Sequence, residues 1–357
     1  MRSLVFTFTL AFTSVISMAG FLNLVEQHLL PQPVQAESEI SKMPAYEQYT
    51  SERLPVETIP AATLPVAATR PKMRIGLFSS DEPVTISVAA ESRVLAGAAH
   101  AKLGTIPANE EITLTYDRST ALYTVSSNSF STTSGDYIKI KPTRANKVTT
   151  ITSYTNPPDW DTAINDNTFY GAVELHYAAT TDTIWVINEL GIENYVKGVA
   201  EAGDDNTQAY LKTLYTAARS YAYYNYLYPT KHEDENYTLD ATANDQVYRG
   251  YGFTARAPNI STAVQATTGT IVHYDGEPVV TPYFSQSDGR TRAWSEVWSG
   301  DYPYLVSVDD PGCAGDELLG HGVGLSAKGA RYFGEQSWHW REILQYYYTG
   351  VELRQLW

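Results

Sequence analysis

The chain has 357 residues, 43% hydrophobic and 18% charged, so it is long enough for two ordinary domains and is not globally disordered. Its formal net charge of -15 excludes the basic face that nucleic acid requires and argues against anionic lipid or wall teichoic acid as the main partner. A single cysteine, Cys313, excludes an internal disulfide and a cysteine-based zinc cluster.

Residues 1–36 are typical of a targeting segment. Arg2 gives a minimal positive start, and Val34 to Ala36 fits the small-residue pattern before a cleavage site. The nearly uncharged stretch Leu4 to Val25 is also long enough to span a bilayer, so a cleaved signal peptide and a retained anchor both stay open. Either one predicts an extracytoplasmic protein. Residues 37–72 are proline-rich and predict an extended linker.

Residues 73–166 have the alternation of β-strands. Val84, Ile86 and Val88 alternate with polar residues, and similar runs lie around Leu114 and Tyr123. Titratable side chains do not cluster convincingly in this stretch. We therefore expect a β-rich lobe that serves as a scaffold or binds a polymer rather than one that catalyses a reaction.

The stretch Gly191 to Tyr228 predicts two helices on either side of a polar turn. Apolar residues at helical spacing predict a short first helix that ends near Glu201. Thr207 is a predicted N-cap for a longer helix, which must stop at Tyr228 because Pro229 disfavours the α conformation before it. The turn carries three carboxylates: Glu201, Asp204 and Asp205.

Further along the chain, Thr270 to Tyr283 predicts a hairpin, because Asp275-Gly276 supplies the positive φ angles of a type I′ turn. A last helix is expected from a cap at Ser337 to Gly350. The expected fold class is α+β, with the β-rich lobe followed by a mixed helix and strand core over residues 167–357.

Several motifs between Asn167 and Gly350 resemble, in one order and at compatible spacing, those of the SpoIID/LytB family. They are YVKGVAEA, LKTLYTAARSYAYY, QVYRGY, TTGTIVHYDGEPVVTPYFSQSDGRT, VWSGDYPYL and GHGVGLSAKGA. The resemblance implies a protein that acts on peptidoglycan in sporulation or wall remodelling. It implies a lytic transglycosylase or, in some members, an enhancer of a wall amidase.

By position, Glu201 resembles the essential glutamate of the family. Cleavage of a glycosidic bond needs a proton donor, and a carboxylic acid with a raised pKa is the usual one. The turn here is two residues shorter than the family pattern, and the Glu-Met-Pro tripeptide is absent. An exposed carboxylate at a helix end is the alternative.

Other residues of these motifs are candidates for contacts with substrate. Arg219 is expected to hold Glu201 or a sugar substituent, with a surface ion pair as the alternative. His321 and Ser326 are expected to hydrogen-bond substrate or to hold Glu201. Ser285 with His321 is not a hydrolase pair, because the nucleophile-elbow glycine and an orienting partner are not identifiable. The remaining predicted cleft residues are Tyr248, Arg249 and Ser287.

Related proteins often carry cysteine and histidine just before the QVY segment, where they resemble a zinc site. Here these places run from Asp240 to Asp245 and offer no soft ligand, so a zinc site cannot form from them. Asp240 and Asp245 could ligate a hard cation, but two carboxylates alone are a weak signal, so we predict no metal and no cofactor. The resulting hypothesis is a peptidoglycan lytic transglycosylase with peptidoglycan glycan strands as its partner. The alternatives are a non-catalytic glycan-binding enhancer of a cell-wall amidase and a purely structural surface protein.

Overall fold

A computed structural model describes residues 69–357. The predicted targeting segment and residues 37–68 of the predicted linker lie outside the described residues. Within residues 69–357, no helix combines the length and the apolar character that crossing a membrane requires.

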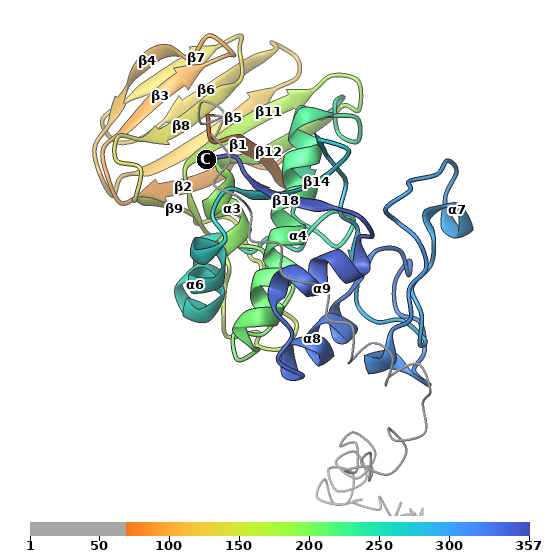
Figure 1. Cartoon of the computed structure of the whole chain (residues 1–357). Coiled ribbons are helices and arrows are strands. Elements are labelled where there is room, and N and C mark those ends of the chain that lie inside the picture. The colour runs from red at the N-terminus through yellow and green to blue at the C-terminus, as the bar shows by residue number, and fades with distance from the viewer. Residues whose placement is uncertain (1–68) are drawn as a thin grey trace, which may run out of the picture. The chain divides into compact units, whose positions relative to one another are not determined.

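Two β-sheets make up the first part of the described chain and share one hydrophobic core (Figure 1). In the first sheet, all neighbouring strands pair antiparallel except the first two of its order, which are parallel. Its seven strands lie in the order β13 (Leu239–Asp240), β1 (Lys72–Ser79), β12 (Thr183–Gly191), β11 (Ala172–Ala178), β8 (Ile138–Pro142), β3 (Ser92–Ala96) and β4 (Ala101–Ile106).

The second sheet confirms the strands that the alternating sequence predicts. Its six antiparallel strands lie in the order β10 (Thr168–Tyr170), β9 (Val148–Ile151), β2 (Val84–Val88), β5 (Glu111–Asp117), β6 (Leu122–Ser126) and β7 (Ser131–Ser134). Along β2, Val84, Ile86 and Val88 are buried while Thr85 and Ser87 are only partly covered. This period of two fixes which face of the strand meets the core.

The seven-stranded sheet contains strands from both sides of the predicted division at residue 166. β11 pairs with β8, and β12 pairs with β1, so the motif-bearing part of the chain adds its first strands to the N-terminal sheet. The division of the chain at this point stays a prediction. The shared sheet gives the segment after β12 a rigid support.

The second part of the described chain surrounds one long helix, α4 (Gln208–Leu227) (Figure 1). Thr207 caps this helix as predicted, because its hydroxyl accepts the N–H of Tyr210 at 3.3 Å. The other helices of the described part are α3 (Ile192–Lys197), α5 (Gly250–Arg256), α6 (Pro258–Ala266), α7 (Trp294–Val297), the 3-10 helix η3 (Pro311–Cys313), α8 (Ala327–Glu335) and α9 (Trp340–Tyr347).

The remaining strands of the described part form two small sheets. The first has the order β15 (Glu277–Pro278), β14 (Thr270–Tyr274) and β18 (Glu352–Gln355), and the second pairs β16 (Tyr283–Phe284) with β17 (Leu325–Ser326) in parallel. The predicted turn between β14 and β15 is confirmed, with positive φ at Asp275 and Gly276. Helices and several sheets together confirm the α+β class.

Three predicted helix ends, in two helices, are wrong. α3 ends at Lys197, with Gly198 as its C-cap, and does not reach Glu201. α9 begins after His339 rather than at Ser337, and its C-cap is Tyr348 rather than Gly350. The apolar spacing was right for both helices. At α9 the start is set locally, because Ser337 has a positive φ and His339 forms a capping box with Glu342.

Helix α4 is buried on several sides. One face of it carries apolar residues at helical spacing, all of them buried: Leu211, Leu214, Tyr215, Ala218 and Ala222. Ser220 is also fully buried, and its hydroxyl donates to the carbonyl of Thr216 at 2.8 Å while it accepts the N–H of Val272 at 2.9 Å. Satisfied polar groups of this kind let a helix lie at the centre of a core.

A network of charged side chains lies on the seven-stranded sheet. Lys139 and Glu174 are buried and form an ion pair at 3.0 Å, and Arg74 contacts Glu174 at 2.6 Å. His176 lies beside Arg74, with 3.3 Å between its Nδ1 and the Nη2 of the arginine. Burial, together with the charge of Arg74, lowers the pKa of His176 to about 4.

This lowered pKa makes stability depend on pH. The unfolded chain binds a proton at His176 below about pH 6.5, whereas the folded protein does so only near pH 4, so stability is lost as the pH falls between these values. We expect the free energy of unfolding to fall less on acidification in His176→Gln than in the parent protein, by about 1 to 2 kcal/mol, because glutamine does not titrate. Urea unfolding of both proteins at pH 7.5 and pH 4.5 measures it, and an equal loss in both proteins contradicts the assignment.

Candidate active site

The turn after α3 is held by backbone pairing with a distant segment. The N–H of Ala200 donates to the carbonyl of Val247 at 2.7 Å, and the N–H of Arg249 donates to the carbonyl of Gly198 at 2.8 Å. A Cβ atom at Gly198 would lie 2.5 Å from the Cε2 atom of Tyr248, so only glycine permits this approach. The chain therefore leaves the helix at Gly198 and runs alongside residues 247–249.

Glu201 follows this pairing directly and is half-buried. Its Oε1 accepts the backbone N–H of Val247 at 2.8 Å. Burial raises the pKa of the Glu201 carboxyl, an effect that the hydrogen bond from Val247 partly opposes. The side chain is thus fixed by backbone atoms and holds its proton more firmly than an exposed glutamate does.

Glu201 lines a cavity of about 860 Å³, here named the large cavity. Its polar lining includes Lys231, Asp245, Ser285 and His321. Rings from α4, β16 and the segment 294–302 form much of the wall. They belong to Tyr221, Tyr224, Tyr283, Trp294, Trp298 and Tyr302. An acid in an aromatic-walled hollow of this size is an arrangement suited to a ligand with apolar faces and polar edges.

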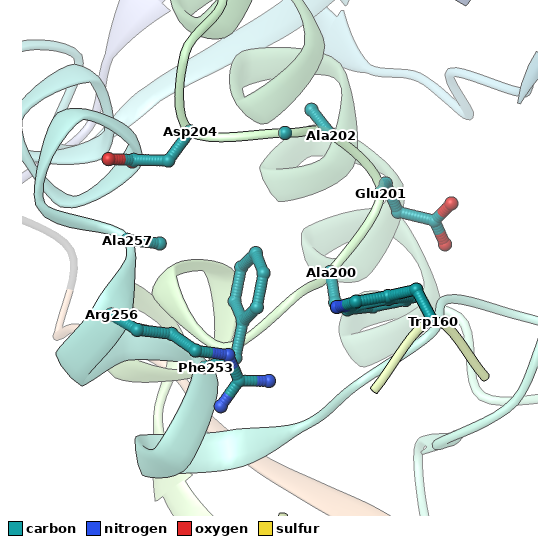
Figure 2. A pocket seen from close by; sticks show the side chains of 9 residues that line it. Trp160, Ala200, Glu201, Ala202, Asp204, Phe253, Arg256 and Ala257 are labelled. Atoms are coloured by element: carbon teal, nitrogen blue, oxygen red, sulfur yellow. The ribbon is translucent and has the colours of Figure 1, made fainter. Parts of the chain in front are cut away.

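Glu201 also lines a second hollow of about 450 Å³, here named the small cavity (Figure 2). Trp160 comes to it from the loop between β9 and β10, and Phe253 and Arg256 come from α5. Figure 2 shows the Glu201 carboxyl pointing away from Phe253 and Arg256. The glutamate thus belongs to the lining of both cavities.

Of the predicted site residues, Ser285 and His321 share the large cavity with Glu201. The two nitrogens of His321 have partners within the protein: Nδ1 accepts the N–H of Val323 at 3.1 Å, and Nε2 lies 3.1 Å from the carbonyl of Tyr283. Burial lowers the pKa of His321, which favours the neutral ring that these two bonds require. The histidine is therefore held as part of the cavity wall.

Arg219 does not lie where the sequence hypothesis puts it. The side chain is fully buried and donates to Glu193 Oε2 at 2.9 Å, so it contacts neither Glu201 nor the cavities. The same glutamate accepts the N–H of Gly269 and the indole N–H of Trp357. Arg219 joins α4 to α3 and to the end of the chain, which is a structural role.

Tyr248 and Arg249 also lie away from the lining of both cavities. Tyr248 is buried, and its hydroxyl donates to Asn188 Oδ1 at 2.9 Å, so it fastens the turn to the sheet. Arg249 lies 3.5 Å from a carboxylate oxygen of Asp166, and its guanidinium stacks 5.3 Å from the ring centre of Trp160. Arg249 thus reaches the small cavity only through that ring.

The last two predicted contact residues are buried in the core. Ser287 donates to Asp310 Oδ2 at 2.6 Å. Ser326 is the N-cap of α8, because its hydroxyl accepts the N–H of Gly329 at 3.2 Å. Both serines therefore position backbone segments and leave no hydroxyl for a ligand in the two cavities.

The sequence hypothesis missed most of the aromatic lining. Trp298 and Tyr302 lie within the quoted motif VWSGDYPYL, so a signal for them was present. Trp160 lies before the first of the motifs, and nothing in its sequence surroundings predicts that it reaches Glu201.

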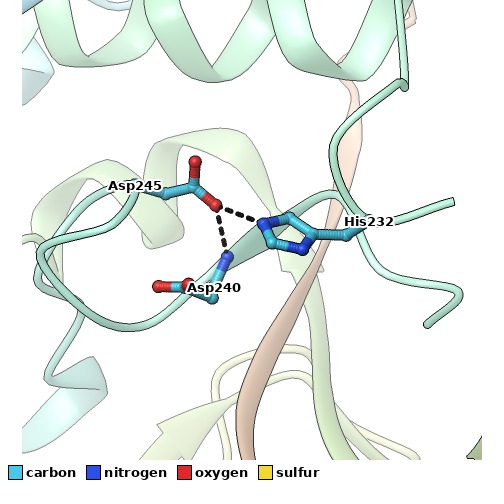
Figure 3. Close-up of side chains that lie close together, drawn as sticks. All are labelled: His232, Asp240 and Asp245. Atoms are coloured by element: carbon cyan, nitrogen blue, oxygen red, sulfur yellow. Dashed lines mark hydrogen bonds and ion pairs between the residues drawn. The ribbon is translucent and has the colours of Figure 1, made fainter. Parts of the chain in front are cut away.

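A cluster of candidate metal ligands lies beside the large cavity. Ligand atoms of His232, Asp240 and Asp245 lie within 4.8 Å of one another (Figure 3), and His232 was not foreseen. Asp245 Oδ2 accepts from His232 Nε2 and from the N–H of Asp240, both at 2.8 Å. Its Oδ1 contacts the ammonium of Lys231 and the hydroxyl of Tyr221.

These contacts do not fit a metal site of the kind that related proteins often carry just before the QVY segment. Burial opposes the charge of Asp245, but the bonds from Lys231 and the Asp240 N–H keep its pKa lowered. Asp240 Oδ1 in turn accepts from the N–H and the hydroxyl of Thr242, both at 2.7 Å. The ammonium of Lys231 already neutralises Asp245, as a bound metal ion otherwise would.

The fold and site together define an α+β protein in which one half-buried acid lines two cavities. Residues 180–274 match the family model described as SpoIID, stage II sporulation protein, which confirms the resemblance to the SpoIID/LytB family. This stretch contains Glu201, α4 and Val247. The chain therefore carries the segment that characterises this family.

Three relatives show similarity over parts of their length. An uncharacterized protein of Brachyspira hyodysenteriae is 33% identical over 153 residues, which are 42% of this chain and 40% of that protein. The amidase enhancer of Bacillus subtilis is 37% identical over 73 residues, 20% of this chain and 10% of the enhancer. Stage II sporulation protein D of the same organism is 32% identical over 82 residues, 20% of this chain and 24% of that protein. The chain thus spans less than half the length of each.

Loss of the buried guanidinium of Arg219 should destabilise the fold. We expect Arg219→Met to cost about 3–5 kcal/mol, because it leaves Glu193 as an unpaired charge. Urea unfolding measures this, with Arg331→Met as the matched control, since Arg331 is exposed and lies 4.0 Å from Glu335. Unchanged stability together with weakened ligand binding would restore the original hypothesis for Arg219.

The occupied ligand atoms of Asp245 should make the protein indifferent to zinc. A metal that binds only the folded state raises the unfolding temperature with its concentration. We expect thermal midpoints with excess zinc and with EDTA to agree within about 1 °C. A saturable rise with zinc, lost in Asp245→Asn, is the result that contradicts this expectation.

Proposed function

We propose that this chain remodels peptidoglycan as a lytic transglycosylase, with Glu201 as its acid and base. The main support is that Glu201, a half-buried carboxyl with a raised pKa, lines both cavities. A raised pKa keeps the proton available at a pH where an exposed glutamate has lost it. The aromatic wall of the large cavity is suited to the apolar faces of sugar rings.

In the proposed reaction, Glu201 first donates its proton to the glycosidic oxygen. The bond between this oxygen and the anomeric carbon breaks, and the leaving sugar departs as an alcohol. The 6-hydroxyl of the muramic acid then attacks the anomeric carbon, and the Glu201 carboxylate takes the hydroxyl proton. The acid is regenerated, and the product carries a 1,6-anhydro ring. No second carboxylate is required, in contrast to the glycosidases that use two.

The comparisons support a role in the cell wall. The matched family segment holds Glu201, and relatives include a stage II sporulation protein D and an amidase enhancer. Because peptidoglycan lies outside the membrane, the proposal requires the described part to be extracytoplasmic, either secreted or anchored. Its primary partner is the glycan strand.

A second candidate function is glycan binding without cleavage, in support of a cell-wall amidase. The similarity to an amidase enhancer favours it, as does the departure of the Glu201 turn from the family pattern. In this alternative the aromatic wall holds the strand, and Glu201 contributes a hydrogen bond rather than a proton. The amidase is then a second partner.

Replacing Glu201 by glutamine should abolish cleavage. Glutamine keeps the side chain's size and can still accept the N–H of Val247, but it cannot donate the proton, so we expect at least about a hundredfold loss of activity. The assay incubates the protein with glycan strands and counts 1,6-anhydromuramic ends by mass spectrometry. Equal thermal midpoints show that folding is intact.

Asp205→Asn is the matched control, since Asp205 lies in the same turn but is exposed and lines neither cavity. It should retain full activity. If the unaltered protein releases no anhydro ends but accelerates an amidase on the same strands, the enhancer function replaces the transglycosylase. If it neither cleaves nor binds glycan, both candidates are wrong.

A further inference from the structure

We propose that the small cavity, which shares Glu201 with the large cavity, is a second sugar subsite and that Trp160 is its stacking platform. This inference rests on the proposed function. It adds a substrate-binding residue from outside the matched stretch 180–274, in a loop between β9 and β10.

The geometry of the two cavities is the first argument. A glycan strand that is cut within its length must have sugars bound on both sides of the scissile bond. The proton donor must then lie where the two binding regions meet, and Glu201 lines both cavities. Their volumes, about 860 and 450 Å³, both lie in the roughly 300–1,000 Å³ range usual for ligand pockets.

The exposure of Trp160 is the second argument. The residue is 65% exposed, the largest exposed fraction of any large hydrophobic residue in the described part of the chain. An exposed indole at the rim of a hollow offers apolar surface that a ligand in that hollow can cover. Stacking of a sugar ring would cover this apolar surface, while the polar groups of the sugar stay in water.

The support beneath Trp160 is the third argument. The guanidinium of Arg249 lies 5.3 Å from the ring centre, and Arg249 is held by Asp166. Asp166 is fully buried and receives two further hydrogen bonds from Arg256, both at 2.6 Å. The exposed ring of Trp160 thus stacks on a guanidinium that is itself fixed by ion pairs. A side chain that is already fixed loses less conformational entropy on binding a ligand than a free one does.

The same ion pairs define what the subsite accepts. Arg256 lines the small cavity, but both of its terminal nitrogens bind Asp166. The carboxylate of Asp204 accepts the N–H of Ile260 at 2.8 Å. Besides Arg256, Asp204 and Glu201, the lining is Trp160, Phe253 and small residues. The subsite therefore fits the face of a neutral sugar ring better than a charged substituent.

The test compares glycan binding by Trp160→Ala and by the parent chain, both in the Glu201→Gln background so that no strand is cut during titration. The probes are a disaccharide of the glycan repeat, which one cavity can hold, and an octasaccharide, which needs both. Calorimetry should show about tenfold weaker binding of the octasaccharide by Trp160→Ala. Binding of the disaccharide in the large cavity should not change.

Two matched variants complete the design. Trp160→Phe keeps an aromatic face and should recover most of the octasaccharide affinity. Tyr226→Ala removes another exposed ring, which lines neither cavity, and should bind like the parent. Circular dichroism and thermal midpoints verify that every variant is folded.

The outcomes separate the two proposals. If Trp160→Ala binds the octasaccharide as tightly as the parent does, the subsite is wrong while the proposed function stands. An equal loss for disaccharide and octasaccharide also overturns the subsite, because the effect then does not depend on reaching a second cavity. If glycan binds neither to the Glu201→Gln parent nor to the protein with Glu201 unchanged, the proposed function and the subsite are both wrong.

Discussion

The site depends on one short stretch of backbone pairing, between residues 198–200 and 247–249. Both backbone polar groups of Val247 take part: its carbonyl accepts the N–H of Ala200, and its own N–H donates to Glu201. Because these are main-chain atoms, the position of the carboxyl depends on the fold rather than on the side chain at residue 247. The close approach of Gly198 to Tyr248 is what makes the pairing possible.

The neighbouring residue, Gln246, extends this pairing into the core. Its carbonyl oxygen accepts the hydroxyl of Tyr195 at 2.8 Å, and its amide nitrogen donates to the carbonyl of Ala218 and to the hydroxyl of Tyr283. One fully buried amide thus connects α3, α4 and the wall of the large cavity. A buried polar network whose members are satisfied favours a single arrangement, and a catalytic group needs support of that kind.

Several charged residues near the site are neutralised by partners on other segments of the chain. Arg219 pairs with Glu193, Asp245 with Lys231, and Asp166 with Arg256. From the sequence, each of these charged residues could contact a substrate, but in the structure each forms an ion pair that stabilises the fold. Glu201 differs, because its neighbour is a neutral backbone N–H and burial raises its pKa. That difference distinguishes a candidate acid from the structural carboxylates around it.

The sequence by itself determined the strands of the lobe, the cap of α4 at Thr207, the turn at Asp275-Gly276, the α+β class and the resemblance to the SpoIID/LytB family. All of these depend on local spacing or on contiguous motifs. It also selected Glu201, while the catalytic role stays a prediction. Only the tertiary structure decided that α3 stops at Gly198, that Arg219 is buried and that Trp160 lies beside Glu201. These outcomes follow from contacts between segments tens of residues apart, and such contacts leave no periodic pattern in either segment.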